Sequence, residues 1–120
     1  MGEVWVAIEV RGLGQNGGAP QKISALADTG AVLTLLPADL LREAGVRPEE
    51  RIQVGLADGS VMDREVGDAR ITVEGKSTAC RVIFGAEKDE PLIGVTVLEQ
   101  VGFMVDPVQR RLVPTQIKIR

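Results

Sequence analysis

The sequence predicts an all-β fold, a small closed barrel with one or two short helices, formed by a single domain over residues 1–120. Three observations support this prediction. Apolar residues recur at every second position in several short segments, which is the period of β-strands with a buried face. Turn signals rich in glycine separate these segments. The chain has 120 residues, of which 44% are hydrophobic and 26% charged, and this suffices for one folded core.

The N-terminal part predicts two strands joined by a loop. Apolar side chains occupy alternate positions of residues 4–10, and residues 23–27 supply the returning strand. Between them, residues 12–20 contain four glycines and a proline, which is typical of a loop. Residues 12–17 also match the glycine spacing of a dinucleotide-binding motif, but that motif needs a helix after it and here another strand follows. We therefore expect no cofactor.

Two short segments predict helices instead. Pro37 suits the first turn of a helix, and Gly45 suits a left-handed stop. Further along, Thr96 and Glu99 have the spacing of a capping box, and Gly102 supplies a second stop. Both helices are short, so the fold remains mainly β.

The middle of the chain predicts two β-hairpins. The alternating residues 52–56 lead to the Asp-Gly pair at 58–59, which is the signal for a two-residue turn, and residues 60–66 return. A second hairpin over residues 70–84 turns at the Gly-Lys pair at 75–76. These hairpins add four strands to the expected sheet.

The C-terminal part predicts two more β segments, one at residues 111–113 after a turn at 105–107, and one at residues 116–120. A weak internal repeat is also present, because residues 41–46 resemble residues 98–103 and each copy follows an apolar segment and a glycine. We interpret the repeat as a pseudo-twofold strand–loop–helix unit, since two copies are too few to stack as a solenoid.

The composition excludes several classes of function. The chain has no histidine, which removes imidazole from acid–base catalysis, from the activation of serine or cysteine nucleophiles and from metal binding. The one cysteine, Cys80, can build neither an internal disulfide nor a thiolate metal site, and it fits a reducing compartment and a buried core position. We therefore expect no metal.

Charge and targeting signals narrow the partners. With 14 Lys+Arg against 17 Asp+Glu, the net charge of −3 gives no overall basic field that would attract nucleic acid. The first residues lack the basic and long apolar regions of a signal peptide, and no run of apolar residues is long enough to span a membrane. We expect a cytoplasmic protein with neither nucleic acid nor membrane as a partner.

The strongest chemical signal is the Asp-Thr-Gly at residues 28–30, between apolar runs at residues 23–27 and 32–36. One interpretation is an Asx turn, in which the aspartate accepts hydrogen bonds from nearby amides and the glycine permits a positive φ. The other is a functional carboxylate, because Asp28 risks burial between apolar strands and the nearest basic residue in the sequence is Lys22. The residues alone leave both interpretations open.

Together with its surroundings, this motif resembles that of the retropepsin-like aspartic proteases, the single-lobe relatives of pepsin that include retroviral proteases. The resemblance covers nearly the whole chain. It rests on the N-terminal strand, on residues 27–31 (Ala-Asp-Thr-Gly-Ala), on the hairpin turning at residues 58–59, and on residues 91–94 (Pro-Leu-Ile-Gly) before a short helix. The internal repeat is consistent with it, because this fold consists of two similar halves.

The resemblance implies a barrel of the acid-protease type and an aspartic endopeptidase that works as a homodimer on a peptide or protein substrate. Each chain would supply Asp28 as the catalytic residue of one shared site. Two close carboxylates share a proton, so together they activate water and protonate the peptide carbonyl. Thr29 would bond across the dimer axis, and Gly30 would let the backbone approach the carboxylate and substrate. This chemistry requires no metal or cofactor.

The resemblance also implies where the substrate binds. The hairpin turning at residues 58–59 would be a flap that closes over an extended peptide, which binds as an added strand. Residues 4–10 and 115–120 would pair across the dimer interface. The candidate substrate-binding residues are Ala31, Val32, Leu56, Asp58, Gly59, Ser60, Leu92 and Ile93.

One departure and two alternatives accompany this hypothesis. After Gly94, the chain has Val95 and Thr96 where retroviral proteases carry an Arg followed by Asn or Asp, so their supporting ion pairs are not expected here. One alternative is a non-catalytic domain of the same fold used for dimerisation or peptide binding. The other is an unrelated small barrel that binds a ligand.

Overall fold

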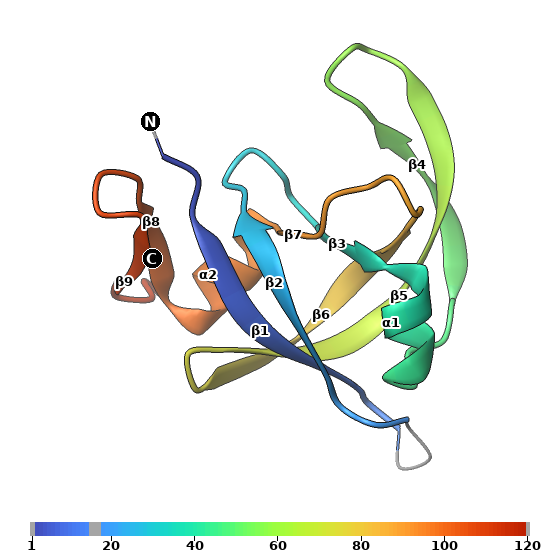
Figure 1. Ribbon diagram of the computed structural model, residues 1–120, viewed down its shortest axis with the longest axis horizontal. Helices are drawn as coiled ribbons and strands as arrows, with labels where there is room; N and C mark the ends of the chain where they lie inside the picture. The colour runs from blue at the N-terminus through green and yellow to red at the C-terminus, as the bar shows by residue number, and fades with distance from the viewer. Residues whose placement is uncertain (1, 15–17, 120) are drawn as a thin grey trace.

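The computed structural model, which describes residues 2–14 and 18–119, contains a closed ring of hydrogen-bonded strands (Figure 1). In ring order the strands are β1 (Trp5–Gly12), β2 (Gln21–Ala27), β7 (Leu92–Ile93), β3 (Thr34–Pro37), β6 (Lys76–Gly85) and β5 (Val61–Val73). The ring closes because β5 also pairs antiparallel with β1. The predicted all-β closed barrel is therefore confirmed.

Three strands lie outside the ring. β4 (Glu50–Gly55) pairs only with the first part of β5, so that the two form a projecting hairpin. β8 (Phe103–Asp106) and β9 (Arg111–Pro114) form a separate two-stranded sheet near the C-terminus (Figure 1). No helix among the described residues is long and apolar enough to cross a membrane.

The alternation of β1 places its apolar side chains inside the barrel. Val6, Ile8 and Val10 are buried, whereas Trp5 and Ala7 at the alternate positions are exposed, as the period of a strand requires. β1 runs antiparallel to β2 with Ile8 opposite Ile23. The loop predicted between these strands includes residues 15–17, which lie outside the described residues. Burial of each such aliphatic side chain contributes about 1.5–3 kcal/mol to folding.

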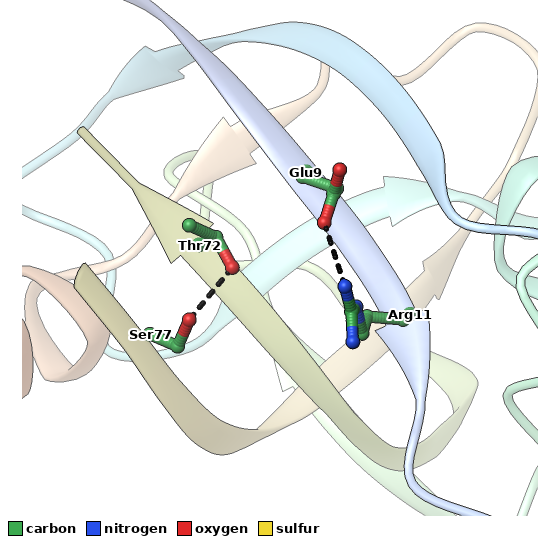
Figure 2. Close-up of polar contacts among 4 residues, drawn as sticks. All are labelled: Glu9, Arg11, Thr72 and Ser77. Atoms are coloured by element: carbon green, nitrogen blue, oxygen red, sulfur yellow. Dashed lines mark hydrogen bonds and ion pairs between the residues drawn. The ribbon is translucent and has the colours of Figure 1, made fainter. Parts of the chain in front are cut away.

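The outer face of the same region is polar (Figure 2). Glu9 on β1 lies opposite Thr72 on β5, which in turn lies opposite Ser77 on β6. The hydroxyl groups of Thr72 and Ser77 are 2.8 Å apart, and the Arg11 guanidinium lies 3.4 Å from the Glu9 carboxylate. Exposed contacts of this kind stabilise a fold little, so they mainly keep this wall of the barrel solvated.

Both predicted hairpins form, but their turns differ from the expected ones. The first is a three-residue loop, because the Leu56 amide donates to Ser60 O at 2.8 Å and Gly59 alone has a positive φ, of 87°. A two-residue turn of the expected type would also need Asp58 at positive φ. The second hairpin turns at Glu74 and Gly75, both at positive φ, one residue earlier than predicted.

β5 is also longer than predicted. The sequence indicated separate segments at residues 60–66 and 70–74, but Val61–Val73 is one continuous strand of 13 residues. Gly67 lies within it, and a side chain there would come 2.3 Å from the Arg47 carbonyl oxygen. The strand thus connects the projecting hairpin directly to the barrel wall.

The two helices begin and end at glycine or proline. α1 (Ala38–Glu43) follows Pro37, and Gly45 after it has a φ of 86°, so the predicted start and stop are confirmed. α2 (Val95–Val101) ends at Gly102, which is left-handed as predicted. The matching stops support the internal repeat.

The capping box predicted for α2 is wrong. The residue at the N-cap is Gly94, without a side-chain cap, and Thr96 lies inside the first turn. The first amides are satisfied by tertiary contacts instead, because Val95 N donates to Ala31 O at 2.7 Å and Thr96 N to Val32 O at 3.3 Å. The start of α2 therefore needs no capping box.

The C-terminal part confirms one predicted strand and not the other. β9 covers the predicted segment 111–113, and the turn before it lies at residues 107–110, after rather than within β8. Residues 115–119 form no strand within the chain. Residues 8–10 of β1 pair on both sides within the chain, with β2 and β5, so their predicted pairing across a dimer interface is wrong.

Cys80 is buried on β6, as its apolar surroundings predicted. Burial, followed by the nearby charge of Asp68, raises the pKa of this thiol to about 12. The thiol therefore stays protonated at neutral pH and behaves as a small core side chain.

Candidate active site

Asp28 lies directly after β2, at the first position of a tight turn. One of its carboxylate oxygens, Oδ1, accepts a hydrogen bond from the Gly30 amide at 2.9 Å, and its carbonyl accepts one from the Ala31 amide at 3.2 Å. The Asx turn is therefore confirmed, but the positive φ expected at Gly30 is wrong, because Gly30 is not among the glycines with a positive φ. The residue is half-buried, and Thr29 and Gly30 beside it are exposed, so the turn also presents the carboxylate at the surface of the chain.

β7 holds this turn from one side. The parallel pairing of β2 with β7 places Ala27 beside Ile93, and the Asp28 amide donates to Ile93 O at 2.9 Å. Two residues earlier on both segments, the Leu26 amide donates to Pro91 O at 2.9 Å. The position of the carboxylate is thus fixed by backbone hydrogen bonds up to the residue that carries it.

The residues after Asp28, here called the Asp28 loop (residues 28–33), contact the start of α2. The carbonyls of Ala31 and Val32 accept the first amides of that helix. A Cβ atom on Gly94 would lie 2.6 Å from the Leu33 carbonyl, so only glycine permits this approach. The helix start and the loop therefore form one rigid unit.

Thr34 also holds the unit formed by the Asp28 loop and the start of α2. Its side chain is buried with 1% exposure, and its hydroxyl accepts a hydrogen bond from the Gly94 amide at 2.9 Å, across 60 residues of sequence. Sequence reasoning missed this residue, although a single hydroxyl within the apolar run of residues 32–36 was a signal that its partner had to be found in the fold.

The β4–β5 hairpin carries the predicted flap residues. In Figure 1 the hairpin and the Asp28 loop both reach toward the top of the view. Leu56 is 43% exposed near the tip, and Val61 and Met62 are exposed on the returning strand. Apolar side chains held in solvent on a projecting hairpin are typical of a surface that closes on a ligand.

The tip itself is ordered by Asp58. Its carboxylate accepts hydrogen bonds from the hydroxyl and the amide of Ser60, and these contacts lower the pKa of Asp58 below its usual value. Asp58, Gly59 and Ser60 are all exposed. The tip is thus a preformed turn that remains charged at neutral pH.

The other predicted substrate-binding residues differ in exposure. Val32 is 67% exposed, and Ala31 and Leu92 are half-buried near the Asp28 loop. Ile93 is fully buried in the core, so its side chain is not available to a substrate. Its carbonyl supports Asp28 instead, and we remove Ile93 from the candidate binding surface.

A cavity of about 670 Å³ lies beside the site rather than over Asp28. It is bounded by Thr29, by α2, by β8 and by residues 115–118 of the C-terminal segment. Exposed apolar side chains, including Met104 and Ile117, lie around it. A single chain therefore presents one carboxylate at an open surface, with an apolar hollow next to it.

The described residues bring together one carboxylate, a rigid loop and a hairpin in reach of peptide-sized ligands. Among residues 2–14 and 18–119, no group of three acidic, cysteine or histidine side chains is placed to hold a metal ion. One carboxylate can act as a base toward water, but activating a peptide bond also needs an acid at the carbonyl oxygen. The Asp28 loop contains one carboxylate, that of Asp28.

A comparison with protein-family models identifies a family to which the chain is similar. The model of a protein family described as "gag-polyprotein putative aspartyl protease" matches residues 16–100, a range that includes the Asp28 loop, the hairpin and most of α2. No curated protein sequence matches the chain significantly.

Proposed function

Since the chain belongs to the retropepsin-like family of gag-polyprotein aspartyl proteases, we propose that it is an aspartic endopeptidase that works as a homodimer. The observation that supports this function best is the surface-facing Asp28, held by backbone hydrogen bonds from β7 and by the Gly30 amide. Each chain has one such loop, so a complete pair of carboxylates requires two chains.

In the proposed mechanism, the Asp28 carboxylates of two chains share one proton and hold a water molecule between them. The ionised carboxylate takes a proton from this water as it attacks the peptide carbonyl, and the protonated one donates its proton to the carbonyl oxygen. The carboxyl that took the proton from water then donates it to the nitrogen of the leaving amine, the C–N bond breaks, and a hydroxyl of the tetrahedral intermediate returns a proton to the other carboxylate as the carboxylic acid product forms. The titration belongs to the pair rather than to either residue.

The neighbouring residues keep the two carboxylates in place. In the proposed dimer, Thr29, which is exposed beside Asp28, contacts its copy in the second chain, and the Gly30 amide donates a hydrogen bond to the carboxylate. Within each chain, the hydrogen bonds from the Asp28 loop to β7 and α2 hold the loop that carries the carboxylate in one position.

The substrate in this proposal is an extended peptide beneath the β4–β5 hairpin. Backbone groups of the peptide pair as an added strand, and its side chains alternate between pockets. Val32, Leu56 and Leu92 are apolar and at least partly exposed, which favours apolar side chains beside the cleaved bond. Ala31 and the tip residues Asp58, Gly59 and Ser60 contact the peptide backbone.

The decisive experiment compares cleavage of a fluorogenic peptide library by the unaltered protein and by Asp28→Asn. We expect loss of at least about 10³-fold in kcat, because an amide can neither accept nor donate the shared proton. Asp106→Asn is the matched control, since Asp106 also accepts from backbone amides two and three residues later but lies in the β8–β9 hairpin. Its activity should be unchanged.

Two outcomes would contradict the proposal. Equal cleavage by Asp28→Asn and the unaltered protein would show that the activity comes from elsewhere. A folded, dimeric protein that cleaves no member of the library and yet binds peptides would favour a non-catalytic peptide-binding domain of the same fold.

A further inference from the structure

Arg64 and Asp89 form an ion pair at the point where the projecting hairpin leaves the barrel. Arg64 Nη2 lies 3.2 Å from Asp89 Oδ2, and the two side chains are 20% and 30% exposed. Among the ion pairs of the described residues, this one has the least exposed side chains. Partial removal from water strengthens the attraction between the charges, so this pair carries more energy than a surface pair.

The hairpin is attached to the barrel on one side only. Residues 51–65, here called the flap ribbon, form β-sheet pairs only with each other in the described part of the chain, and β5 gains its second neighbour, β6, from Val66 onward. A two-stranded ribbon is marginally stable by itself, and two ion pairs among the described residues join this one to the barrel, Arg42–Glu65 at 3.9 Å and Arg64–Asp89 at 3.2 Å. Arg64 lies two residues before this base, where a small restraint has a large effect on the position of the tip.

Asp89 belongs to the segment that leads into β7, the strand that pairs with β2 next to the Asp28 loop. The connecting loop (residues 86–91) joins β6 to β7 and lies between the flap ribbon and the Asp28 loop in Figure 1. Asp89 Oδ2 also accepts from the Ala86 amide at 2.8 Å, and the Asp89 amide donates to Ala86 O at 3.0 Å. Asp89 is thus half-buried while Glu87, Lys88 and Glu90 around it are exposed.

The connecting loop and β7 are hydrogen-bonded to the end of β2 and to Asp28. Pro91 O accepts from the Leu26 amide and Ile93 O from the Asp28 amide, each at 2.9 Å. From Arg64 to Asp28 there is therefore a continuous path of one ion pair, four residues of chain and one backbone hydrogen bond. Such a path allows the position of the flap ribbon to be set relative to Asp28.

We propose that Arg64 and Asp89 are positioning residues, a latch that holds the flap ribbon in register over the Asp28 loop and so sets substrate affinity. This inference rests on the proposed protease function for its kinetic consequence, but not for its structural one. Neither side chain touches the reacting atoms; Arg64 acts through the ribbon and Asp89 through the connecting loop.

The test uses Arg64→Gln, Asp89→Asn and the double variant. Asparagine keeps an oxygen for the Ala86 amide, so the turn of the connecting loop is preserved. We expect each single variant to raise KM for a cleaved peptide roughly five-fold with kcat changed less than about two-fold, the size expected for one partly buried charged contact. The double variant should be no worse than either single variant, and Arg64→Lys should recover part of the affinity.

Hydrogen–deuterium exchange gives a readout that needs no catalysis. In the variants, amides of the flap ribbon and of the connecting loop should exchange faster, while those of β1 and β2 stay as protected as in the unaltered protein. Arg81→Gln is the matched control, because Arg81 also joins the base of the hairpin to the barrel, through Glu50 at 2.8 Å, but both side chains are about half exposed and neither belongs to the connecting loop. It should change neither exchange at the hairpin tip nor KM.

The outcomes separate the latch from the protease function. If the unaltered protein cleaves no peptide, the proposed function fails, and the exchange experiment still decides the latch. Additive effects in the double variant, unchanged exchange of the flap ribbon, or equal effects of Arg81→Gln would each overturn the latch. Faster exchange throughout the barrel would show a general loss of stability and would overturn it as well.

Discussion

Thr34 shows how one buried hydroxyl determines the geometry of a site that it does not touch. It is the buried polar side chain of the described core, and its partner is the backbone amide of Gly94. That amide precedes the helix whose first N–H groups contact the Asp28 loop. The Thr34 hydroxyl accepts a hydrogen bond from the buried Gly94 amide, which water cannot reach. An apolar side chain at this position could not accept this hydrogen bond.

We expect Thr34→Val to lower the free energy of unfolding by about 1–3 kcal/mol, because it leaves the buried Gly94 amide without an acceptor while hardly changing the volume. Urea denaturation measures this change. Thr72→Val is the control, since Thr72 also lies on a strand and bonds to a hydroxyl, but at the exposed face shown in Figure 2. It should cost less than about 0.5 kcal/mol. Equal costs would contradict the role of Thr34.

At the scale of elements, the flap ribbon depends on the left-handed residue at its tip. Gly59 has a φ of 87°, and the turn from Leu56 to Gly59 is closed by a hydrogen bond of 2.9 Å. L-residues with a Cβ adopt this conformation at a cost of about 1–2 kcal/mol. The tip is therefore the point at which the ribbon is most sensitive to substitution.

Gly59→Ala should raise KM several-fold and speed amide exchange at residues 54–62, because the strained tip opens the hairpin. The thermal unfolding of the barrel should change little, since the ribbon lies outside the closed ring. Gly55→Ala serves as the control, because its φ is not in the left-handed region and a Cβ there meets open space. If both variants behaved alike, the tip conformation would not matter.

The sequence predicted most elements because their signals are local. The alternation of residues 4–10, the Asp-Gly pair and the helix stops at Gly45 and Gly102 all depend on neighbours within a few positions. β7 was not identified as a strand, because two residues carry no period and its pairing with β2 joins segments more than 60 residues apart. The capping box at Thr96 was wrong for the same reason, since carbonyls of a distant loop satisfy those amides.

The candidate site was predicted to a similar extent. The Asp-Thr-Gly signal predicted the turn at Asp28 and the family resemblance predicted the hairpin, because both are contiguous in sequence, whereas their roles in catalysis stay predictions. Thr34, the restriction of Gly94 to glycine and the Arg64–Asp89 pair became visible only in the fold, since each contact joins residues at least 25 positions apart or depends on backbone approach. Ile93 was misassigned to the binding surface because the sequence shows only that the residue is apolar. It does not show whether the side chain faces a ligand or the core.

At the scale of the whole molecule, the proposed function makes activity a property of two chains, because each chain has one Asp28. We expect an excess of Asp28→Asn to suppress the activity of the unaltered protein, because it draws unaltered chains into dimers with one functional aspartate. The measurement is the cleavage rate at a fixed amount of unaltered protein and increasing amounts of variant. Asp106→Asn in the same excess should add activity. A rate that does not respond to Asp28→Asn would show that a single chain suffices.

The free outer side of β4 has a consequence for solubility. The barrel ring has no open edge, but β4 has a neighbour on one side only and could template the growth of a sheet between molecules. Its exposed residues include Glu50, Arg51 and Gln53, and Gly55 ends the strand. Charges of both signs on so short an edge strand discourage repeated strand addition, which would lead to aggregation. The same charges do not prevent one extended peptide from pairing with β4.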